Sequence, residues 1–230
     1  MVVFRGYGVS FDLFASWSAF RCDADAVEDP KAIVRRGYDL VSRAYRSDDA
    51  SEQQYGPWLD QLEDLVQCGA RVLDLGCGCG VPVARRLARS FDVTGVDLSP
   101  AQITRARELV PSATFVCEDM AILSFPDESF GAITAFYSLI HLPLDEQPVL
   151  LRNIARWLQP GGVFMTTVGH GAWTGREKDW LGVSGAEMWW SHADADTYRR
   201  WLIEAGLRIE SEAFVPEGRG GHTFLRSARP

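Results

Sequence analysis

Basic residues are in short supply in this chain. Its 230 residues include 23 Lys and Arg against 31 Asp and Glu, which gives a formal net charge of -8 and a sequence pI of about 5.0. The basic residues are scattered, so no segment carries the positive patch that a nucleic-acid backbone requires. The composition therefore disfavours a nucleic-acid substrate or partner.

Cysteine is also scarce, and its spacing is not that of a metal site. The five cysteines are odd in number and irregularly placed, and two of them lie within a glycine-rich segment. They are Cys22, Cys68, Cys77, Cys79 and Cys117. We predict reduced thiols in a cytoplasmic protein. No carboxylate-histidine cluster has the spacing of a metal site either, so no bound metal is expected.

Long apolar runs and internal repeats are missing from the sequence as well. The most apolar terminus, Met1 to Phe20, is interrupted by Arg5 and Asp12 and carries no cleavage-like site. This argues against both a signal peptide and a membrane span, so no membrane partner is expected. A chain of this length fits one domain. We predict an N-terminal extension over residues 1–30 and a single domain over residues 31–230.

Strand-like and helix-like segments alternate along most of the chain. Strands are predicted at residues 71–75, 91–96, 114–117, 131–136, 163–168, 207–213 and 222–226. Helices are predicted at residues 32–46, 57–66, 82–90, 100–110, 145–158 and 194–205, and Ser99 with Pro100 is suited to begin the fourth of them. The alternation indicates an α/β fold with a doubly wound, mostly parallel sheet of seven strands.

The last two predicted strands have no helix between them. They can therefore pair only as an antiparallel hairpin, across a loop at residues 216–221. This predicts an antiparallel strand at the C-terminal end of the sheet. The one long irregular stretch, residues 169–193, is longer than a simple connection requires.

A glycine loop is the strongest chemical signal in the sequence. The apolar strand that begins at Val72 ends in three alternate glycines, Gly76, Gly78 and Gly80, where the backbone can turn sharply and approach a ligand. Asp97 ends the second strand about twenty residues later, where a carboxylate can hold ribose hydroxyls. The pattern favours a nucleoside-binding loop over a turn that only connects strand and helix.

A nicotinamide enzyme would use the same acid. Its pattern places the third glycine one residue later, where this chain has Val81. The spacing therefore disfavours a pyrophosphate, and a nicotinamide oxidoreductase is a distant alternative.

The chain resembles the class I S-adenosylmethionine (SAM) dependent methyltransferases of the small-molecule type. The likeness rests on the loop Leu73-Asp74-Leu75-Gly76-Cys77-Gly78-Cys79-Gly80 and on four shorter segments. These are residues 95–99, 117–120, 125–130 and 158–162. The resemblance implies a Rossmann-like fold, SAM as the cofactor and S-adenosylhomocysteine as the product.

The resemblance also implies roles for residues of the first two strands. Gly76 and Gly78, with Cys77 between them, would lie against the methionyl part of the cofactor. Asp97, followed by Leu98, would take the ribose hydroxyls.

Further cofactor contacts are implied after the later strands and before the first one. Asp119 and Met120 would meet the edge and face of the adenine, and Phe136 would line the reactive side. Tyr45 matches a tyrosine that many such enzymes bring over the cofactor, although helix packing would explain it equally well. Asp74 would hold the loop or the amino group of the cofactor through water, or would be purely structural.

The histidines are the candidates for a general base, because an unperturbed imidazole titrates near neutral pH. His141 follows the fourth strand and would either act as a base or contact the cofactor. His170 emerges after the fifth strand, and His192 precedes the last helix, where it would face the acceptor or only pack. His222 begins the last strand, where a structural role competes with a place in the acceptor pocket.

The segment 169–193 is predicted to arch over the site as a substrate lid. It is rich in tryptophan, with Trp173, Trp180, Trp189 and Trp190. Indole side chains lining a pocket suit an apolar or aromatic acceptor and would exclude water. In an equally weighted interpretation, the tryptophans build only the core of the lid. Trp173, Trp189, Trp190, His192 and His222 are the predicted acceptor-binding residues.

The predicted function is methyl transfer from SAM to a small-molecule acceptor, of the kind found in secondary metabolism. Alignment of donor and acceptor would provide most of the catalysis. Two alternatives stay open: a protein or RNA methyltransferase, and a SAM-binding protein with another reaction such as a cyclisation. The acceptor atom and the oligomeric state are not predicted.

Overall fold

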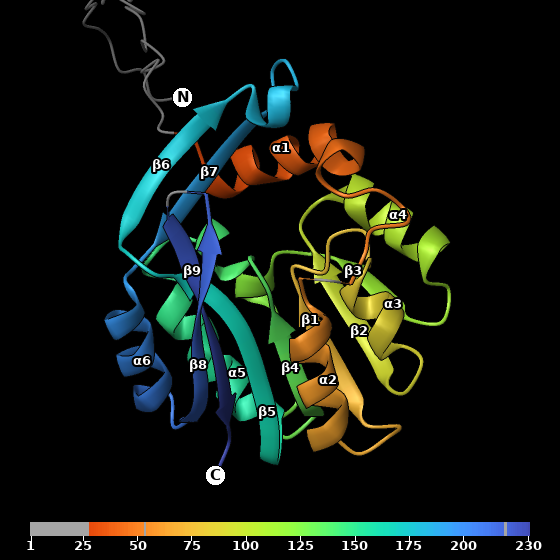
Figure 1. Ribbon diagram of the computed structural model, residues 1–230, viewed down its shortest axis with the longest axis vertical. Helices are drawn as coiled ribbons and strands as arrows, with labels where there is room; N and C mark the ends of the chain where they lie inside the picture. Colours follow the sequence, from red (N-terminus) through yellow and green to blue (C-terminus); the bar gives the residue numbers. More distant parts are fainter. Residues whose placement is uncertain (1–27, 53, 219) are drawn as a thin grey trace, which may run out of the picture.

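A seven-stranded sheet with helices on both faces forms the body of the computed structural model, which describes residues 28–52, 54–218 and 220–230 (Figure 1). The strand order is β3-β2-β1-β4-β5-β9-β8. Bounds are β1 Arg71–Leu75, β2 Asp92–Asp97, β3 Thr114–Cys117, β4 Phe130–Ala135, β5 Leu158–Gly169, β8 Arg208–Glu217 and β9 Gly220–Ala228. The first five of these pair in parallel, and β9 is antiparallel to both neighbours. The predicted fold is confirmed.

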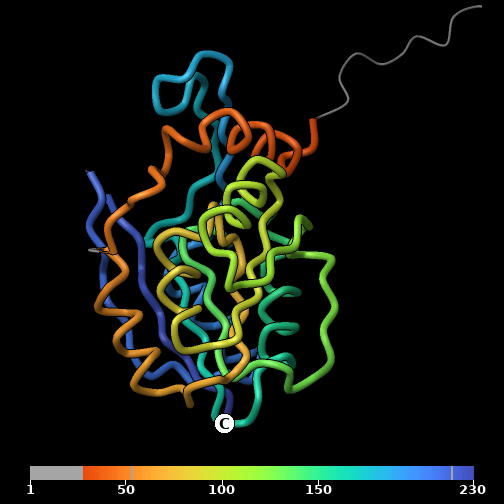
Figure 2. Tube along the Cα trace, turned by 90° about the vertical axis from the view of Figure 1, so that its right-hand side faces the viewer, coloured from red at the N-terminus to blue at the C-terminus, as the bar shows by residue number. Residues whose placement is uncertain are grey.

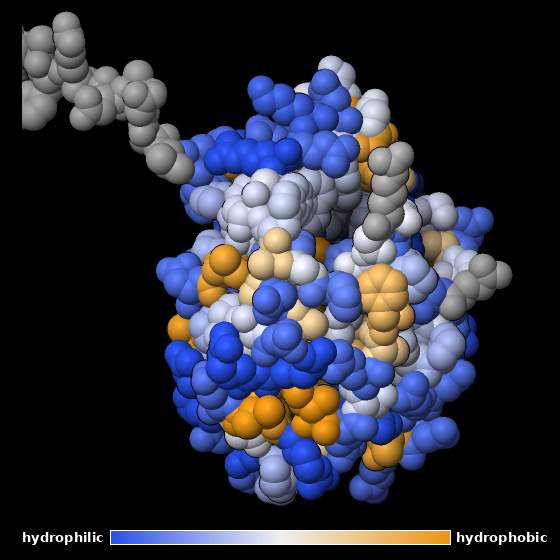
Figure 3. Space-filling view, turned by 60° about the vertical axis from the view of Figure 1, so that its left-hand side comes forward, coloured by the Kyte–Doolittle hydropathy of each residue, from blue (hydrophilic) through white to orange (hydrophobic). Residues whose placement is uncertain are grey.

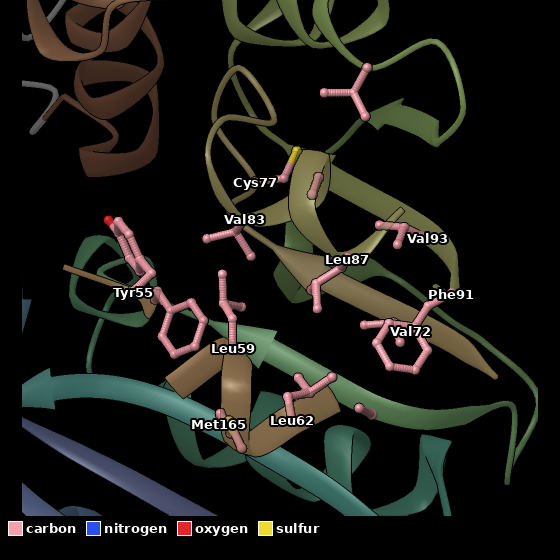
Figure 4. Close-up of a cluster of buried hydrophobic side chains, with 14 of the residues drawn as sticks. Tyr55, Leu59, Leu62, Val72, Cys77, Val83, Leu87, Phe91, Val93 and Met165 are labelled. Carbon is pink, nitrogen blue, oxygen red and sulfur yellow. The ribbon is translucent and has the colours of Figure 1, made fainter. Parts of the chain in front are cut away.

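Two hydrophobic cores lie on the two faces of the sheet, because successive side chains of a strand point in opposite directions. Val72 faces the first core, with α2 (Gly56–Leu65), α3 (Val83–Leu87) and α4 (Pro100–Leu109) (Figure 4). Leu73 faces the second core, with α5 (Gln147–Trp157) and α6 (Ala195–Glu204). The parallel strands are thus covered on both sides and end at one common edge.

Helix α1 (Pro30–Tyr45) and a two-stranded hairpin cover that edge, where the parallel strands have their carboxyl ends (Figures 1 and 2). The hairpin consists of β6 (Trp173–Lys178) and β7 (Glu187–His192), paired antiparallel. Ile33 and Val34 of α1 pack against Met188 and Trp189 of β7 in a small core of their own. The residues predicted to form an irregular lid therefore form an ordered hairpin over the sheet.

The observed starts of the helices agree with the predictions from the sequence more closely than the observed lengths of the elements do. Ser99 caps α4 as predicted, its hydroxyl accepting a hydrogen bond from the Gln102 amide at 3.2 Å. Within the described ranges, three short 3₁₀ helices complete the elements: η1 (Met120–Ile122), η2 (Leu139–His141) and η3 (Trp180–Gly182).

One loop and one strand differ from the prediction in extent. Strand pairing continues to Glu217 and Gly220, so the loop expected at residues 216–221 is shorter. The strand expected at residues 163–168 begins earlier, because residues 159–162 are part of β5, which starts at Leu158. A bulge in the β4–β5 pairing accommodates these residues within the strand.

The described part of the chain contains no helix long and apolar enough to cross a membrane. Among the same residues, no group of three or more histidine, cysteine or acidic side chains is arranged to hold a metal ion. The cysteines that can be placed, Cys68, Cys77, Cys79 and Cys117, are free. Residues 1–27, which hold most of the predicted extension, lie outside the described residues.

Candidate cofactor and active site

The glycine loop after β1 is held by the end of β2. Gly76 and Gly78 have positive φ angles of 74° and 55°, a conformation that disfavours side chains with a Cβ. Asp97 accepts a hydrogen bond from the Gly78 amide at 2.8 Å with one carboxylate oxygen and from the Ser99 amide at 2.9 Å with the other. Desolvation by burial raises the pKa of Asp97 to about 6. The carboxylate thus shapes the loop and keeps lone pairs for a ligand.

A pocket beside the loop is lined by groups of opposite charge. Asp74 and Arg46 both line it, together with Gly76 and Gly78. The Asp74 carboxylate is buried: one oxygen accepts a hydrogen bond from the Thr134 hydroxyl at 2.7 Å, and the other has no partner. Burial raises the pKa of Asp74 to about 7. A buried oxygen without a partner is costly unless a ligand supplies a donor.

A second pocket continues from the first, and the two share Tyr45, Gly76 and Phe136. The remaining predicted cofactor residues line it: Asp97, Leu98, Asp119, Met120 and His141. Cys77 lines the first pocket and is buried. The structure therefore brings every residue predicted to bind the cofactor to one continuous site.

Lys31 lines the second pocket and pairs with two carboxylates. Its ammonium lies 2.6 Å from a carboxylate oxygen of Asp119 and 2.8 Å from one of Glu146. The other Asp119 oxygen accepts a hydrogen bond from the Ala121 amide at 2.9 Å. Both oxygens of the predicted adenine-binding carboxylate are therefore engaged, one of them by helix α1.

His141 is enclosed by hydrogen bonds on both ring nitrogens. Nδ1 lies 2.8 Å from the Trp189 carbonyl oxygen, which can only accept, so Nδ1 carries the proton. Nε2 must then accept from the Tyr38 hydroxyl at 2.9 Å. Burial lowers the pKa of His141 to about 4. The ring joins α1 to the hairpin, and this favours a structural and pocket-lining role over the predicted role as a base.

Replacing His141 by Gln tests this role through stability. The folded pKa of about 4 lies below the ordinary value of 6.5, so the stability that the neutral ring contributes is lost as pH falls from about 6.5 to about 4. We expect His141→Gln to lower the free energy of unfolding by about 1–2 kcal/mol at pH 8, with the deficit shrinking towards pH 5. Urea denaturation at both pH values measures it, and a deficit that grows on acidification contradicts this account.

The other three histidines lie outside the cofactor pockets. His170 is exposed, with Nδ1 3.0 Å from the Thr223 hydroxyl and its ring against Phe214. His192 and His222 line a separate open hollow with Trp173 and Trp190. Their predicted roles towards the acceptor stay predictions.

Some tryptophans of the hairpin form a core of the lid, and others form an aromatic surface. Trp189 is buried in the core with α1, and Trp180 packs on Tyr38 and Tyr45. Trp173 and Trp190 line the hollow, and Trp173 is 50% exposed. The lid thus has a core of its own and an aromatic surface turned outwards.

Lys31, Tyr38 and Arg46 are among the site residues that were not predicted from the sequence. These three lie on or directly after α1, whose helical spacing signals packing but not which residues face a pocket. The available signal was the spacing of Tyr38 and Tyr45, which are about two helical turns apart and therefore lie on one face of α1.

The residues present fit SAM, which combines an adenosine, a sulfonium and an amino-acid group. The first pocket offers a carboxylate oxygen without a partner for an ammonium and a guanidinium for a carboxylate. The second pocket offers carboxylates and an apolar wall for a nucleoside. The two pockets meet at Phe136, where the sulfonium would lie.

A glycine loop at the carboxyl edge of a parallel sheet, with an acid at the end of the next strand, defines an enzyme fold that binds a nucleoside cofactor. A family profile described as a methyltransferase domain matches residues 72–162. The malonyl-[acyl-carrier protein] O-methyltransferase of Halorhodospira halophila is 32% identical over 202 residues, which cover 83% of this chain and 68% of that protein. The chain belongs to the class I SAM-dependent methyltransferase family, whose cofactor is SAM.

Two further similarities extend this result. The 27-O-demethylrifamycin SV methyltransferase of Amycolatopsis mediterranei is 38% identical over 153 residues, covering 56% of this chain and 55% of that protein. The crystal structure of magnesium protoporphyrin IX methyltransferase from Synechocystis PCC 6803 with bound SAM superposes with a TM-score of 0.70 at 17% identity, covering 90% of this chain and 100% of that one. At this identity the structural likeness concerns the fold. The chain spans 33% and 53% of the length of two other curated relatives.

Proposed function

We propose that this protein binds SAM along the two joined pockets and transfers its methyl group to a small-molecule acceptor. The observation that carries the proposal is the charge arrangement at the glycine loop. Asp74 keeps a buried carboxylate oxygen without a partner beside Arg46, as an amino-acid group requires. Asp97 and Asp119 lie further along the same site.

The cofactor supplies a methyl group on a sulfonium, which is reactive towards a nucleophile without further activation. The residues of the chain therefore bind, orient and exclude water. Asp97 anchors the ribose and the loop together, and Phe136 presents an apolar wall at the junction of the pockets. Tyr45, the last residue of α1, lines both pockets. Alignment of this kind contributes several kcal/mol to lowering the barrier.

A small molecule is the acceptor class that the surface favours. The net charge of -8 disfavours an RNA substrate, and the site is covered by α1 and the β6–β7 hairpin. A relative named for a rifamycin supports a place in secondary metabolism for this chain. The free thiols among the described residues support a reducing, cytoplasmic compartment.

Product analysis tests the proposal. The purified protein is incubated with SAM and a panel of phenols, amines and thiols, and S-adenosylhomocysteine is measured together with the acceptor mass. We expect release of S-adenosylhomocysteine matched by the gain of one methyl group on one acceptor class. Conversion of a substrate while bound SAM stays unchanged would instead support a non-methyl reaction such as a cyclisation.

A further inference from the structure

A second hollow lies outside the cofactor pockets, between two hairpins. Trp173, Trp190 and His192 line it from the β6–β7 hairpin, and Glu217 and His222 line it from the β8–β9 hairpin. Figure 3 shows this face of the molecule, where the surface is indented beneath the hydrophilic end of the upper hairpin. The hollow combines flat indole surfaces with titratable groups, which is the composition of a site for a polar aromatic molecule.

Side chains of the hollow contact side chains of the cofactor site. Tyr137 lines the second cofactor pocket, and its ring meets that of His222 edge to face, with centroids 5.0 Å apart. Trp190 lies 5.9 Å from His141, measured between ring centroids. No described residue lines both, so a molecule in the hollow reaches the cofactor site only past these pairs of contacting side chains. Tyr137 has a positive φ of 55°, which marks this junction as a constrained part of the backbone.

Glu217 determines which ring nitrogen of His222 carries the proton. A carboxylate oxygen of Glu217 lies 2.9 Å from His222 Nδ1. At this distance Glu217 raises the pKa of His222, because its negative charge favours the charged ring. A negative charge at this distance favours the tautomer with the proton on Nδ1, which leaves Nε2 as an acceptor. Nδ1 is buried, so the exposed part of the side chain is the remainder of the ring.

The other histidines are less suited to take a proton. Both nitrogens of His141 are already engaged, and His170 lies outside the hollow against Phe214. His192 lines the hollow, but its Nδ1 is buried without a partner against Gly169, and no described carboxylate pairs with it. Of the four, His222 alone combines access to the hollow with a carboxylate that would stabilise its charged form.

We propose that this hollow binds the methyl acceptor as a hydroxyl-bearing aromatic molecule, and that His222 accepts the hydroxyl proton; the inference rests on the proposed methyl transfer. The indoles of Trp173 and Trp190 hold the aromatic ring. As the acceptor oxygen forms its bond to the methyl carbon, the carbon–sulfur bond breaks and its electron pair goes to sulfur. The proton moves to His222 Nε2, and the resulting imidazolium is stabilised by Glu217 until solvent in the open hollow removes the proton.

The groups that face His222 set the direction of its pKa. Burial lowers the pKa of His222, the charge of Glu217 raises it, and the neighbouring His192 lowers it. The net effect is a pKa below the ordinary value. Further titratable groups near His222 are Tyr137, which packs on its ring, Glu177, which lines the hollow, and His141. His222 is therefore neutral near pH 7 and able to accept a proton.

4-Nitrophenol provides a direct probe, because its phenolate absorbs visible light. The protein is saturated with S-adenosylhomocysteine, which prevents transfer, and bound 4-nitrophenol is titrated with pH. We expect it to ionise at a pH about one unit below that of the free phenol, because proton transfer to His222 stabilises the phenolate. His222→Gln should abolish this shift, Glu217→Gln should reduce it, and His170→Gln should leave it unchanged.

SAM calorimetry on the same proteins separates the possible failures. SAM binding by His222→Gln shows that the variant is folded, so that loss of the shift reflects the imidazole. Failure of the wild type to bind 4-nitrophenol while it binds SAM, or an equal shift in His222→Gln, overturns this inference and leaves the methyltransferase proposal standing. Failure of the wild type to bind SAM overturns the proposed function itself.

Discussion

Alanine at Gly76 should unfold the cofactor loop, whereas alanine at Gly78 should leave the fold intact and block the cofactor. A Cβ added to Gly76 would lie 2.2 Å from the Ser138 Cβ, and the Ser138 hydroxyl is fixed by its hydrogen bond to the Leu75 carbonyl at 2.7 Å. The positive φ of 74° adds strain of about 1–2 kcal/mol. We expect Gly76→Ala to lower the free energy of unfolding by about 3 kcal/mol or more.

Gly78 differs because a Cβ there meets nothing within 4 Å and projects into open space beside the pocket that it lines. Gly78→Ala should therefore cost only the strain of its positive φ, about 1 kcal/mol, yet weaken SAM binding tenfold or more. Gly161 is the matched control, since it has a positive φ and open space but lies far along the chain from the loop. Urea denaturation and SAM calorimetry on all three variants test this prediction. Equal SAM affinity of Gly78→Ala and Gly161→Ala would contradict the account.

Asp74→Asn should stabilise the ligand-free protein and weaken the binding of SAM. The folded pKa of about 7 lies above the ordinary value of 3.8, so the protonated form is favoured in the folded state and stability is lost as pH rises from about 4 to about 7. At pH 8 the buried carboxylate is charged and one oxygen has no partner. Asparagine removes the charge and keeps an acceptor for the Thr134 hydroxyl, so we expect a gain of about 1–3 kcal/mol in unfolding free energy at pH 8 and little change at pH 5.

The same substitution removes the partner of the cofactor's ammonium group. SAM affinity should fall about tenfold to a hundredfold at pH 8. We expect the affinity of the wild type to rise from pH 6 to pH 8 as Asp74 ionises, and this rise should be absent from the variant. Asp92→Asn, on the exposed first residue of β2, provides the control with the same chemical change. A variant that is less stable and still binds SAM fully would show that Asp74 is purely structural.

The sheet and the glycine loop could be predicted because local signals agree there. Apolar strands, helix-starting residues such as Ser99 and Pro100, and glycines where φ is positive all indicate the same fold. The β6–β7 hairpin could not be predicted in this way. Strand β6 carries charged and exposed residues with no apolar alternation, and it is ordered by pairing with β7, which packs on α1.

The roles of individual site residues depend on partners that are distant in sequence. His141 stands at the position expected for a base, but Tyr38 and the Trp189 carbonyl, 103 and 48 residues away, enclose its ring. Lys31 reaches Asp119 across 88 residues. Such pairs arise from the packing of α1 and the hairpin over the sheet, so no local pattern reveals them.

Calorimetric titration of SAM into the wild type and Asp97→Ala tests the central claim most directly. The claim is that the site between the glycine loop and the end of β2 binds this cofactor, and the test needs no knowledge of the acceptor. Asp97 holds the Gly78 amide and lines the pocket predicted for the ribose. The account predicts binding of SAM by the wild type and a loss of at least a hundredfold, about 3 kcal/mol, in a folded Asp97→Ala. A folded wild type that does not bind SAM, or a variant that binds it equally well, would contradict the account.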